Sequence, residues 1–226
     1  MHVILMGAQG SGKGTQAERL VPQLHLAHLS TGNLFRAAMA AETPLGREIK
    51  PIYDRGDLIP DDITLRLVED RLREIAEERR MGADLQGALF DGFPRTRAQA
   101  AGLDDSLRQR SERISMVVEI QVPADVLVRR LAGRRVCTNC GATFHVDFEP
   151  PTRPGVCDRC GGQLVQRADD TPEGVQRRLD HYFEQTAPLL AYYRERELLV
   201  SIDGDRQVED VTADIVHALA QLARAS

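Results

Sequence analysis

The chain has 226 residues, of which 42% are hydrophobic and 28% charged, and its net charge is −5. This length suits one large hydrophobic core with small insertions. The acidic balance argues against a general nucleic-acid-binding protein, which usually carries a basic excess. No apolar run reaches membrane-spanning length, and the first residues lack the basic start of a signal sequence. We therefore expect a cytoplasmic protein with no nucleic-acid or membrane partner. We expect a monomer, since the sequence leaves no apolar surface stripe over.

The N-terminal stretch passes from an apolar run to a glycine-rich loop and then to a helical pattern. Residues 3–6 predict a buried strand, and apolar spacing predicts a helix over residues 16–24. The loop between them contains four glycines and Lys13. Glycines allow backbone N–H groups to converge on one point, and the N-terminus of the following helix favours an anion there. The loop is therefore predicted to hold phosphates, and Lys13 is predicted to place its positive charge beside the outer phosphates.

Two features of this loop are unusual. Lys13 and Lys50 are the only lysines in the chain, which indicates that the loop requires a compact ammonium group rather than a guanidinium. Gly14 stands where the general motif has Ser or Thr, and Thr15 follows one residue late. We therefore expect Mg²⁺ to find other ligands or waters.

The next strand, predicted over residues 26–30, leads into Ser-Thr-Gly. Thr31 is predicted to cap a helix that starts near Asn33, with Arg36 on its first turn. From these residues alone, a phosphate-facing loop and a plain capped helix with a solvated arginine are equally good interpretations.

A second polar turn follows the apolar strand predicted over residues 88–91, which ends in Asp91. A carboxylate at the end of a strand beside a phosphate loop can organise Mg²⁺, directly or through water. The turn after it presents Arg95. Thr96 is predicted to cap the next helix, on which Gln99 lies one turn along.

Other elements follow from periodicity and from turn residues. We predict helices over 45–54, 61–80, 123–135 (ending in Arg129, Arg130, Arg134 and Arg135), from Thr171-Pro172, and 208–222, and strands over 116–122, 143–148 and 198–202. Leu189, Leu190, Tyr192 and Tyr193 are assigned to the core, and the six histidines are assigned no chemistry.

Two Cys-x2-Cys-Gly units begin at Cys137 and Cys157, and sixteen residues separate the pairs. Each pair can hold two thiolates on one turn, and two pairs complete a tetrahedral Zn²⁺ site. Because all four ligands are cysteines, no coordination position is left open, so the metal is structural. The predicted ligands are Cys137, Cys140, Cys157 and Cys160.

Alternating strands and helices predict an α/β fold with a mostly parallel sheet. The whole set of motifs resembles the adenylate kinases of the long bacterial type with a zinc-binding lid. The matching motifs are Gly7 to Thr15, Ser30 to Arg36, Asp91 to Thr96, Gly133 to Arg135, the paired Cys-x2-Cys, Arg167 to Asp170 (through Asp169) and Arg177 to Leu179.

The resemblance implies the P-loop nucleoside monophosphate kinase fold, with five parallel strands flanked by helices and the phosphate-loop strand in the centre. It also implies two mobile insertions in a core of residues 1–29, 60–132 and 171–226. Residues 30–59 would be the AMP-binding unit and residues 133–170 the zinc-binding lid.

The resemblance also implies residue roles. For ATP these are Gly10, Ser11, Gly12, Lys13, Gly14, Thr15, Arg134, Thr143, Phe144 and Arg206. For AMP they are Thr31, Arg36, Asp57, Leu58, Ile59, Gly92, Phe93, Pro94, Arg95, Gln99, Arg167 and Arg178, with Arg36 and Arg95 on the phosphate and Gln99 facing adenine. The catalytic set would be Lys13, Arg95, Arg134, Arg167 and Arg178, with Asp91 on Mg²⁺ through water.

The implied reaction is the reversible, Mg²⁺-dependent transfer of a phosphoryl group from ATP to AMP, giving two ADP. Two residues depart from the family pattern. Asn33 replaces a common Asp and so removes a carboxylate from the Mg²⁺ water shell, and Gln9 replaces a common Pro in the loop.

Two other functions compete with this one. The first is a related kinase such as UMP/CMP kinase or GTP:AMP phosphotransferase, although Gln99 and the long lid favour AMP. The second is a zinc-ribbon nucleic-acid-binding module joined to a P-loop regulator. The net charge of −5 and the lack of interleaved aromatic and basic residues around the cysteines argue against the second.

Overall fold

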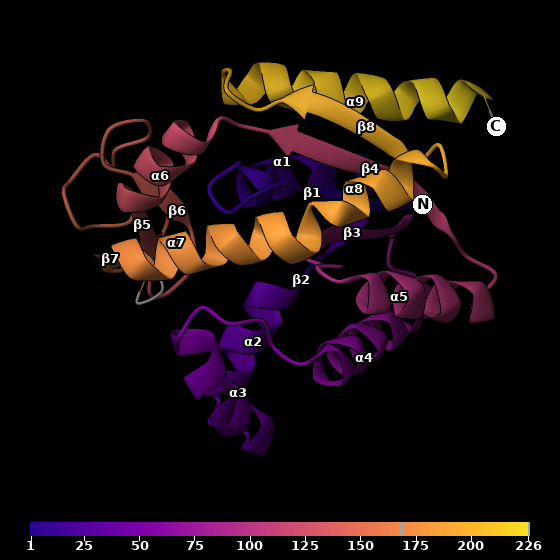
Figure 1. Cartoon of the computed structure of the whole chain (residues 1–226), viewed down its shortest axis with the longest axis horizontal. Coiled ribbons are helices and arrows are strands. Elements are labelled where there is room, and N and C mark those ends of the chain that lie inside the picture. Colours follow the sequence, from indigo (N-terminus) through magenta and orange to yellow (C-terminus); the bar gives the residue numbers. More distant parts are fainter. Residues whose placement is uncertain (168–169, 226) are drawn as a thin grey trace.

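The computed structural model describes residues 1–167 and 170–225, so Asp169, named in one motif above, lies outside the described residues. A parallel five-stranded sheet forms the centre of the molecule, in the order β2-β3-β1-β4-β8 (Figure 1). The strands are β1 (His2–Met6), β2 (Leu26–Ser30), β3 (Gly87–Asp91), β4 (Ile114–Gln121) and β8 (Leu199–Asp203). The predicted fold class is confirmed, with the phosphate-loop strand β1 in the centre.

Helices cover both faces of this sheet and extend beyond it (Figure 1). They are α1 (Lys13–Leu24), α2 (Thr31–Ala40), α3 (Pro44–Asp54), α4 (Asp61–Arg80), α5 (Arg97–Gln109), α6 (Ala124–Ala132), α7 (Pro172–His181), the π-helical turn η2 (Tyr182–Thr186), α8 (Pro188–Arg194) and α9 (Val208–Ala225).

The core has two layers because successive side chains of a strand point to opposite faces. On one face, Ile4 of β1 packs with residues of α4, α5 and α8, including the fully buried Tyr193. On the other face, Val3 and Leu5 pack with α1 and α9. Both faces of β1 are therefore buried, which explains why its sequence is apolar without alternation.

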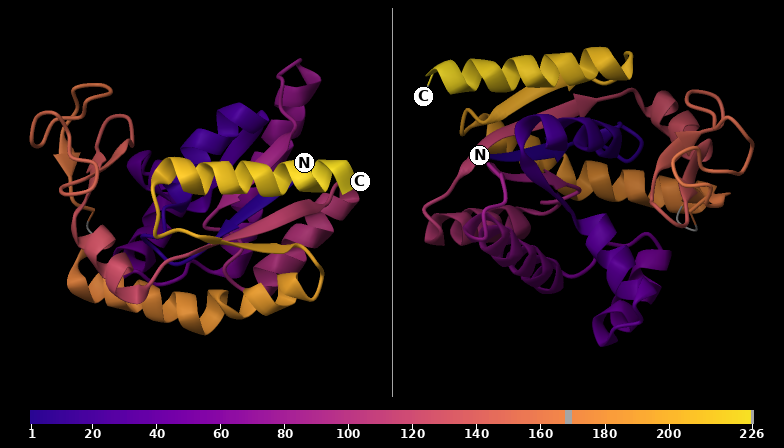
Figure 2. Two further views of the ribbon diagram at one scale, coloured as in Figure 1. Left: turned by 90° about the horizontal axis from the view of Figure 1, so that it is seen from above. Right: turned by 180° about the vertical axis from the view of Figure 1, so that it is seen from behind.

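Two segments protrude from the sheet. The helix pair α2 and α3 projects beyond β2, and residues 134–165 carry a small antiparallel sheet, ordered β6-β5-β7, at one end of the molecule (Figures 1 and 2). Its strands are β5 (Arg134–Cys137), β6 (Thr143–His145) and β7 (Leu164–Val165). In the part of the chain that is described, no helix is both long and apolar enough to cross a membrane.

Three local predictions are wrong. Ser30, not Thr31, is the N-cap of α2, which places Arg36 on the second turn. The helix predicted over 123–135 ends at Ala132, because Arg134 pairs instead with His145 in an antiparallel ladder. The strand predicted over 143–148 ends at His145, whose Nδ1 accepts N–H groups from the next turn.

Other local predictions are confirmed. Helix α4 spans the predicted 61–80. The Thr96 hydroxyl caps α5 by accepting the Gln99 N–H at 3.1 Å, and the Thr171 hydroxyl caps α7 by accepting the Gly174 N–H at 3.1 Å. These elements depend on residues within one turn of each other, which is why local patterns predicted them.

Candidate active site

A cavity of about 880 Å³ opens at the carboxyl ends of β1 and β3. Its walls come from the glycine-rich loop, α2, the segment after α3, the turn after β3, the small antiparallel sheet, α7 and the loop before α9. Every residue that the sequence assigned to ATP, AMP or Mg²⁺ lines this one cavity. Ligands of doubly wound α/β proteins bind at this edge of the sheet.

The glycine-rich loop has the geometry of a phosphate cradle. Gly10 and Gly12 have φ of 86° and 97°, values that L side chains adopt rarely. Helix α1 starts directly after the loop, at Lys13. The Ser11 hydroxyl is buried and, among the described residues, has no hydrogen-bond partner. Backbone N–H groups, a helix N-terminus and an unsatisfied hydroxyl together fit a bound phosphate.

Lys13 folds back over this loop. Its Nζ donates to the carbonyl oxygens of Gly7 and Ala8 at 2.7 and 2.8 Å. The pKa of Lys13 is lowered to about 8, chiefly by burial and also by the charges of nearby arginines, against the opposing charge of Asp91. A phosphate would stabilise the charged amine and reverse this shift.

Asp91 ends β3 beside the loop, and its Oδ2 lies 3.6 Å from Nε2 of His28. Burial opposes the charge of this carboxylate, but His28 and Lys13 outweigh burial and hold the pKa of Asp91 below its ordinary value. An ionised carboxylate that faces the phosphate loop fits a role in holding Mg²⁺ or its waters. Sequence analysis assigned no chemistry to His28, because only the β2–β3 pairing brings it to Asp91.

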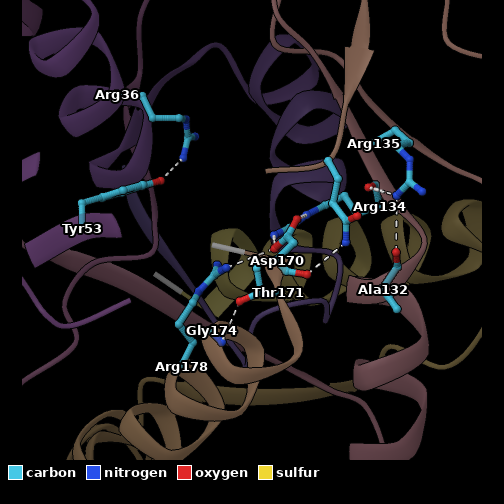
Figure 3. Close-up of polar contacts among 10 residues, drawn as sticks. Arg36, Tyr53, Ala132, Arg134, Arg135, Asp170, Thr171, Gly174 and Arg178 are labelled. Atoms are coloured by element: carbon cyan, nitrogen blue, oxygen red, sulfur yellow. Dashed lines mark hydrogen bonds and ion pairs between the residues drawn. The ribbon is translucent and has the colours of Figure 1, made fainter. Parts of the chain in front are cut away.

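Arg134 of β5 and Arg178 of α7 meet at one carboxylate, that of Asp170 (Figure 3). The Asp170 side chain is fully buried. It accepts from Nε of Arg134 at 2.8 Å, from Nη2 of the same side chain, and from Nη1 of Arg178 at 3.2 Å. Sequence analysis gave Asp170 no role, although Asp170 is the last residue of the motif from Arg167 to Asp170.

Arg36 of α2 lies in a different part of the cavity. Its Nη1 donates to the Tyr53 hydroxyl at 2.7 Å (Figure 3), and its Nη2 donates to Oδ1 of Asn33. Asn33 therefore faces Arg36 in this structure. Thr31 is the first residue of α2 and not its cap, and its hydroxyl donates to the Gly92 carbonyl at 3.0 Å.

Arg95 is held by the turn that follows β3. Its Nε donates to the Gly92 carbonyl at 2.8 Å, and its own carbonyl accepts from the Thr186 hydroxyl at 3.0 Å. Burial lowers the pKa of Arg95, and the charge of Arg178 lowers it further. A bound anion would offset the repulsion between these two cations, which fits a phosphate site.

Arg206, assigned to the ATP base, lines the cavity from the loop before α9. It pairs with Asp214 at 2.6 Å and with Asp210 at 3.8 Å.

The four cysteines form one cluster away from this cavity, with all Sγ atoms within 4.8 Å of one another. The Sγ atoms of Cys137 and Cys160 lie 3.5 Å apart, and those of Cys140 and Cys157 lie 3.6 Å apart. A tetrahedral site with Zn–S bonds of about 2.3 Å requires sulfurs about 3.8 Å apart. All four cysteines are free of disulfides, so the cluster fits Zn²⁺.

A phosphate loop that shares its cavity with arginines from separate, protruding segments defines a class of protein. Such an arrangement neutralises the oxygens of a phosphoryl group in transfer, which is the main task of P-loop phosphotransferases.

Comparison with known proteins identifies the family within this class. The family model for adenylate kinase matches residues 5–198. An adenylate kinase of Bacillus pumilus is 49% identical over 98% of this chain and 99% of its own length. One of Bacillus subtilis is 46% identical over 99% and 100%, and one of Moorella thermoacetica is 49% identical over 98% and 99%. The chain belongs to the adenylate kinase family.

Proposed function

We propose that this chain transfers the terminal phosphoryl group of ATP to AMP, reversibly and with Mg²⁺, to give two ADP, and so serves adenine nucleotide homeostasis. The observation that carries the proposal is that the glycine-rich loop and all five proposed catalytic cations line one cavity. ATP, AMP and ADP are then its partners, and its place of action is the cytoplasm, where it acts as a monomer.

On the ATP side, residues 10–15 surround the phosphates, and the ammonium group of Lys13 contacts the β and γ phosphates. Arg134, Thr143, Phe144 and Arg206 complete this half of the cavity. Asp91 would hold Mg²⁺ through water, and the chemistry that the metal would supply is further charge neutralisation at the phosphate oxygens.

On the AMP side, Arg36 and Arg95 bind the phosphate and Gln99 faces the adenine. Thr31, residues 57–59 and residues 92–94 form the rest of this half. Arg167 and Arg178 contact the phosphates between the two nucleotides. The acceptor is already largely dianionic near neutral pH, because the second pKa of a phosphate monoester is about 6, so no general base is needed.

Catalysis then consists of positioning and charge neutralisation. Two polyanions come together only where fixed cations offset their repulsion. Closure of residues 133–170 over the cavity excludes water, which would otherwise accept the phosphoryl group. Residues 30–59 close over AMP in the same way.

The four cysteines would hold Zn²⁺ as a structural metal in the lid. The buried apolar cluster of the lid is small and consists of Cys137, Ala142, Phe144, Cys157 and Leu164. A closed four-thiolate site stabilises such a small unit and offers no position for substrate.

The test is an ADP-forming assay with ATP, Mg²⁺ and, in parallel, AMP, CMP, UMP or GMP. We expect turnover with AMP and far less with the other three. Lys13→Ala should abolish turnover while the circular dichroism spectrum stays native. A higher kcat/KM with UMP or CMP would replace this proposal by a pyrimidine nucleotide kinase. Salt-dependent retention on DNA or RNA near physiological ionic strength would instead support the nucleic-acid-binding alternative.

A further inference from the structure

The amide of Gln99 has an asymmetric set of hydrogen-bond partners. Gln99 lies on the first turn of α5, is 2% exposed, and lines the same cavity as the apolar side chains of Phe35 and Ile59. Its Oε1 accepts from the backbone N–H of Arg95 at 2.8 Å. Its Nε2 donates to Oδ1 of Asp61, the first residue of α4, at 2.7 Å.

These two partners allow only one orientation of the amide. A backbone N–H can only donate, and a carboxylate can only accept. A half-turn of the amide would set Nε2 against the Arg95 N–H and Oε1 against the Asp61 carboxylate, which leaves buried polar groups unpaired.

Asp61 is itself held in place. Its Oδ2 accepts from the Thr96 hydroxyl at 2.9 Å, and the oxygen of that hydroxyl accepts from the Gln99 N–H. The carboxylate therefore joins the start of α4 to the start of α5, two helices that lie side by side (Figure 1). The orientation of the amide thus depends on a residue that is remote from it in sequence.

A fixed amide distinguishes the two classes of purine. One Nε2 hydrogen and one Oε1 lone pair remain for a ligand. A 6-aminopurine offers an acceptor at N1 and a donor at N6, which match this pair. A 6-oxopurine offers a donor at N1 and an acceptor at O6, and would need the amide reversed. An amide free to turn would pair with either base.

We infer that Asp61 is a positioning residue that fixes the Gln99 amide for 6-aminopurine nucleotides and against 6-oxopurine nucleotides. The inference rests on the proposed function, in which Gln99 faces the base of the acceptor. It adds the residue that sets base selectivity.

The test compares AMP with inosine monophosphate, whose base carries the 6-oxo group without the extra 2-amino group of guanine. The readout is the ratio of kcat/KM for AMP to kcat/KM for inosine monophosphate at saturating ATP and Mg²⁺. Because both values come from one preparation, a loss of folded protein cancels from the ratio. For the unmodified chain we expect a ratio of at least about 100, since a reversed amide leaves buried groups unpaired.

Asp61→Asn can donate as well as accept, so only the Arg95 N–H then opposes the reversed amide. The ratio should therefore fall about tenfold and not to one. Asp61→Ala leaves the Nε2 side of the amide unconstrained and should also lower the ratio of the two kcat/KM values. It is the variant to use if Asp61→Asn folds poorly. The matched control is Asp62→Asn, the neighbouring residue, whose side chain is 76% exposed and pairs with Arg66. The control should keep the original ratio.

The possible failures are separable. If the unmodified chain forms no ADP from ATP and AMP, the proposed function itself is wrong. If it does so but uses inosine monophosphate equally well, or if both Asp61 variants keep its full ratio, the role of Asp61 is refuted while the proposed function stands.

Discussion

The carboxylate of Asp170 gives a sharp prediction, because it is the shared partner of two proposed phosphate-binding arginines. We expect Asp170→Asn to destabilise the ligand-free protein much more than the protein with a bound bisubstrate dinucleotide. Without ligand, Asp170 is the partner that Arg134 and Arg178 share in this structure. With ligand, the phosphates supply negative charge to the same guanidinium groups, so the loss of the carboxylate matters less.

The expected magnitude follows from the contacts and their exposure. Breaking a buried ion pair from one side costs about 3–5 kcal/mol. The side chains of Arg134 and Arg178 are 15% and 13% exposed, so water screens part of this loss. Asn also retains one accepting oxygen. Charge-assisted hydrogen bonds are worth about 1.5–3 kcal/mol each. We therefore expect the free energy of unfolding to fall by about 3 kcal/mol without ligand. With ligand, we expect it to fall by about 1 kcal/mol.

The assay is thermal and urea unfolding with and without a saturating dinucleotide that joins two adenosines through phosphates. For a chain of this length, 3 kcal/mol corresponds to a fall in Tm of roughly 6–12 °C. The matched control is Asp180→Asn on α7, whose exposed carboxylate accepts from Gln176. The control should change Tm by no more than about 1 °C, as surface substitutions usually do. An equal loss in both ligand states would refute the reasoning, because the phosphates would then not be replacing Asp170.

Three further predictions concern Lys13, the cysteines and Asn33. Because the pKa of Lys13 is lowered to about 8, its charge is present below that pH and is lost above it. The Kd for ATP should therefore rise about eightfold between pH 7.5 and 9. Lys50→Ala is the control and should keep this dependence of Kd on pH. If Kd changes as little with pH in the native chain as in Lys13→Ala, the prediction is wrong. Removal of metal with a chelator should lower Tm more than it lowers activity at low temperature, and equal losses would argue against a purely structural metal. Asn33→Asp should raise the KM for AMP about three- to tenfold at constant kcat, since a carboxylate would compete with AMP for Arg36. Asn33→Ala adds no charge and should raise the KM for AMP less. Equal KM values for the two variants would count against this competition.

The sequence alone predicted the elements and motifs that depend on neighbouring residues. Apolar periodicity predicted α4 to its observed bounds, and the Thr96 and Thr171 caps were predicted because each cap involves residues three positions apart. The glycine-rich loop and the two cysteine pairs were recognised for the same reason. Their chemistry needs a short, ordered run of residue types, and that run is visible in the chain.

The tertiary structure decided which distant groups meet. Tyr53 contacts Arg36 across 17 positions, Asp170 contacts Arg134 across 36, and Asp61 contacts Gln99 across 38. The end of α6 was also mispredicted, because pairing of Arg134 with His145 ends the helix early. Local propensity carries no information about such partners. The sequence therefore identified the cationic side chains of the site. The groups that orient them, such as Tyr53 for Arg36 and Asp170 for Arg134, became apparent only from the packing of the sheet and its helices.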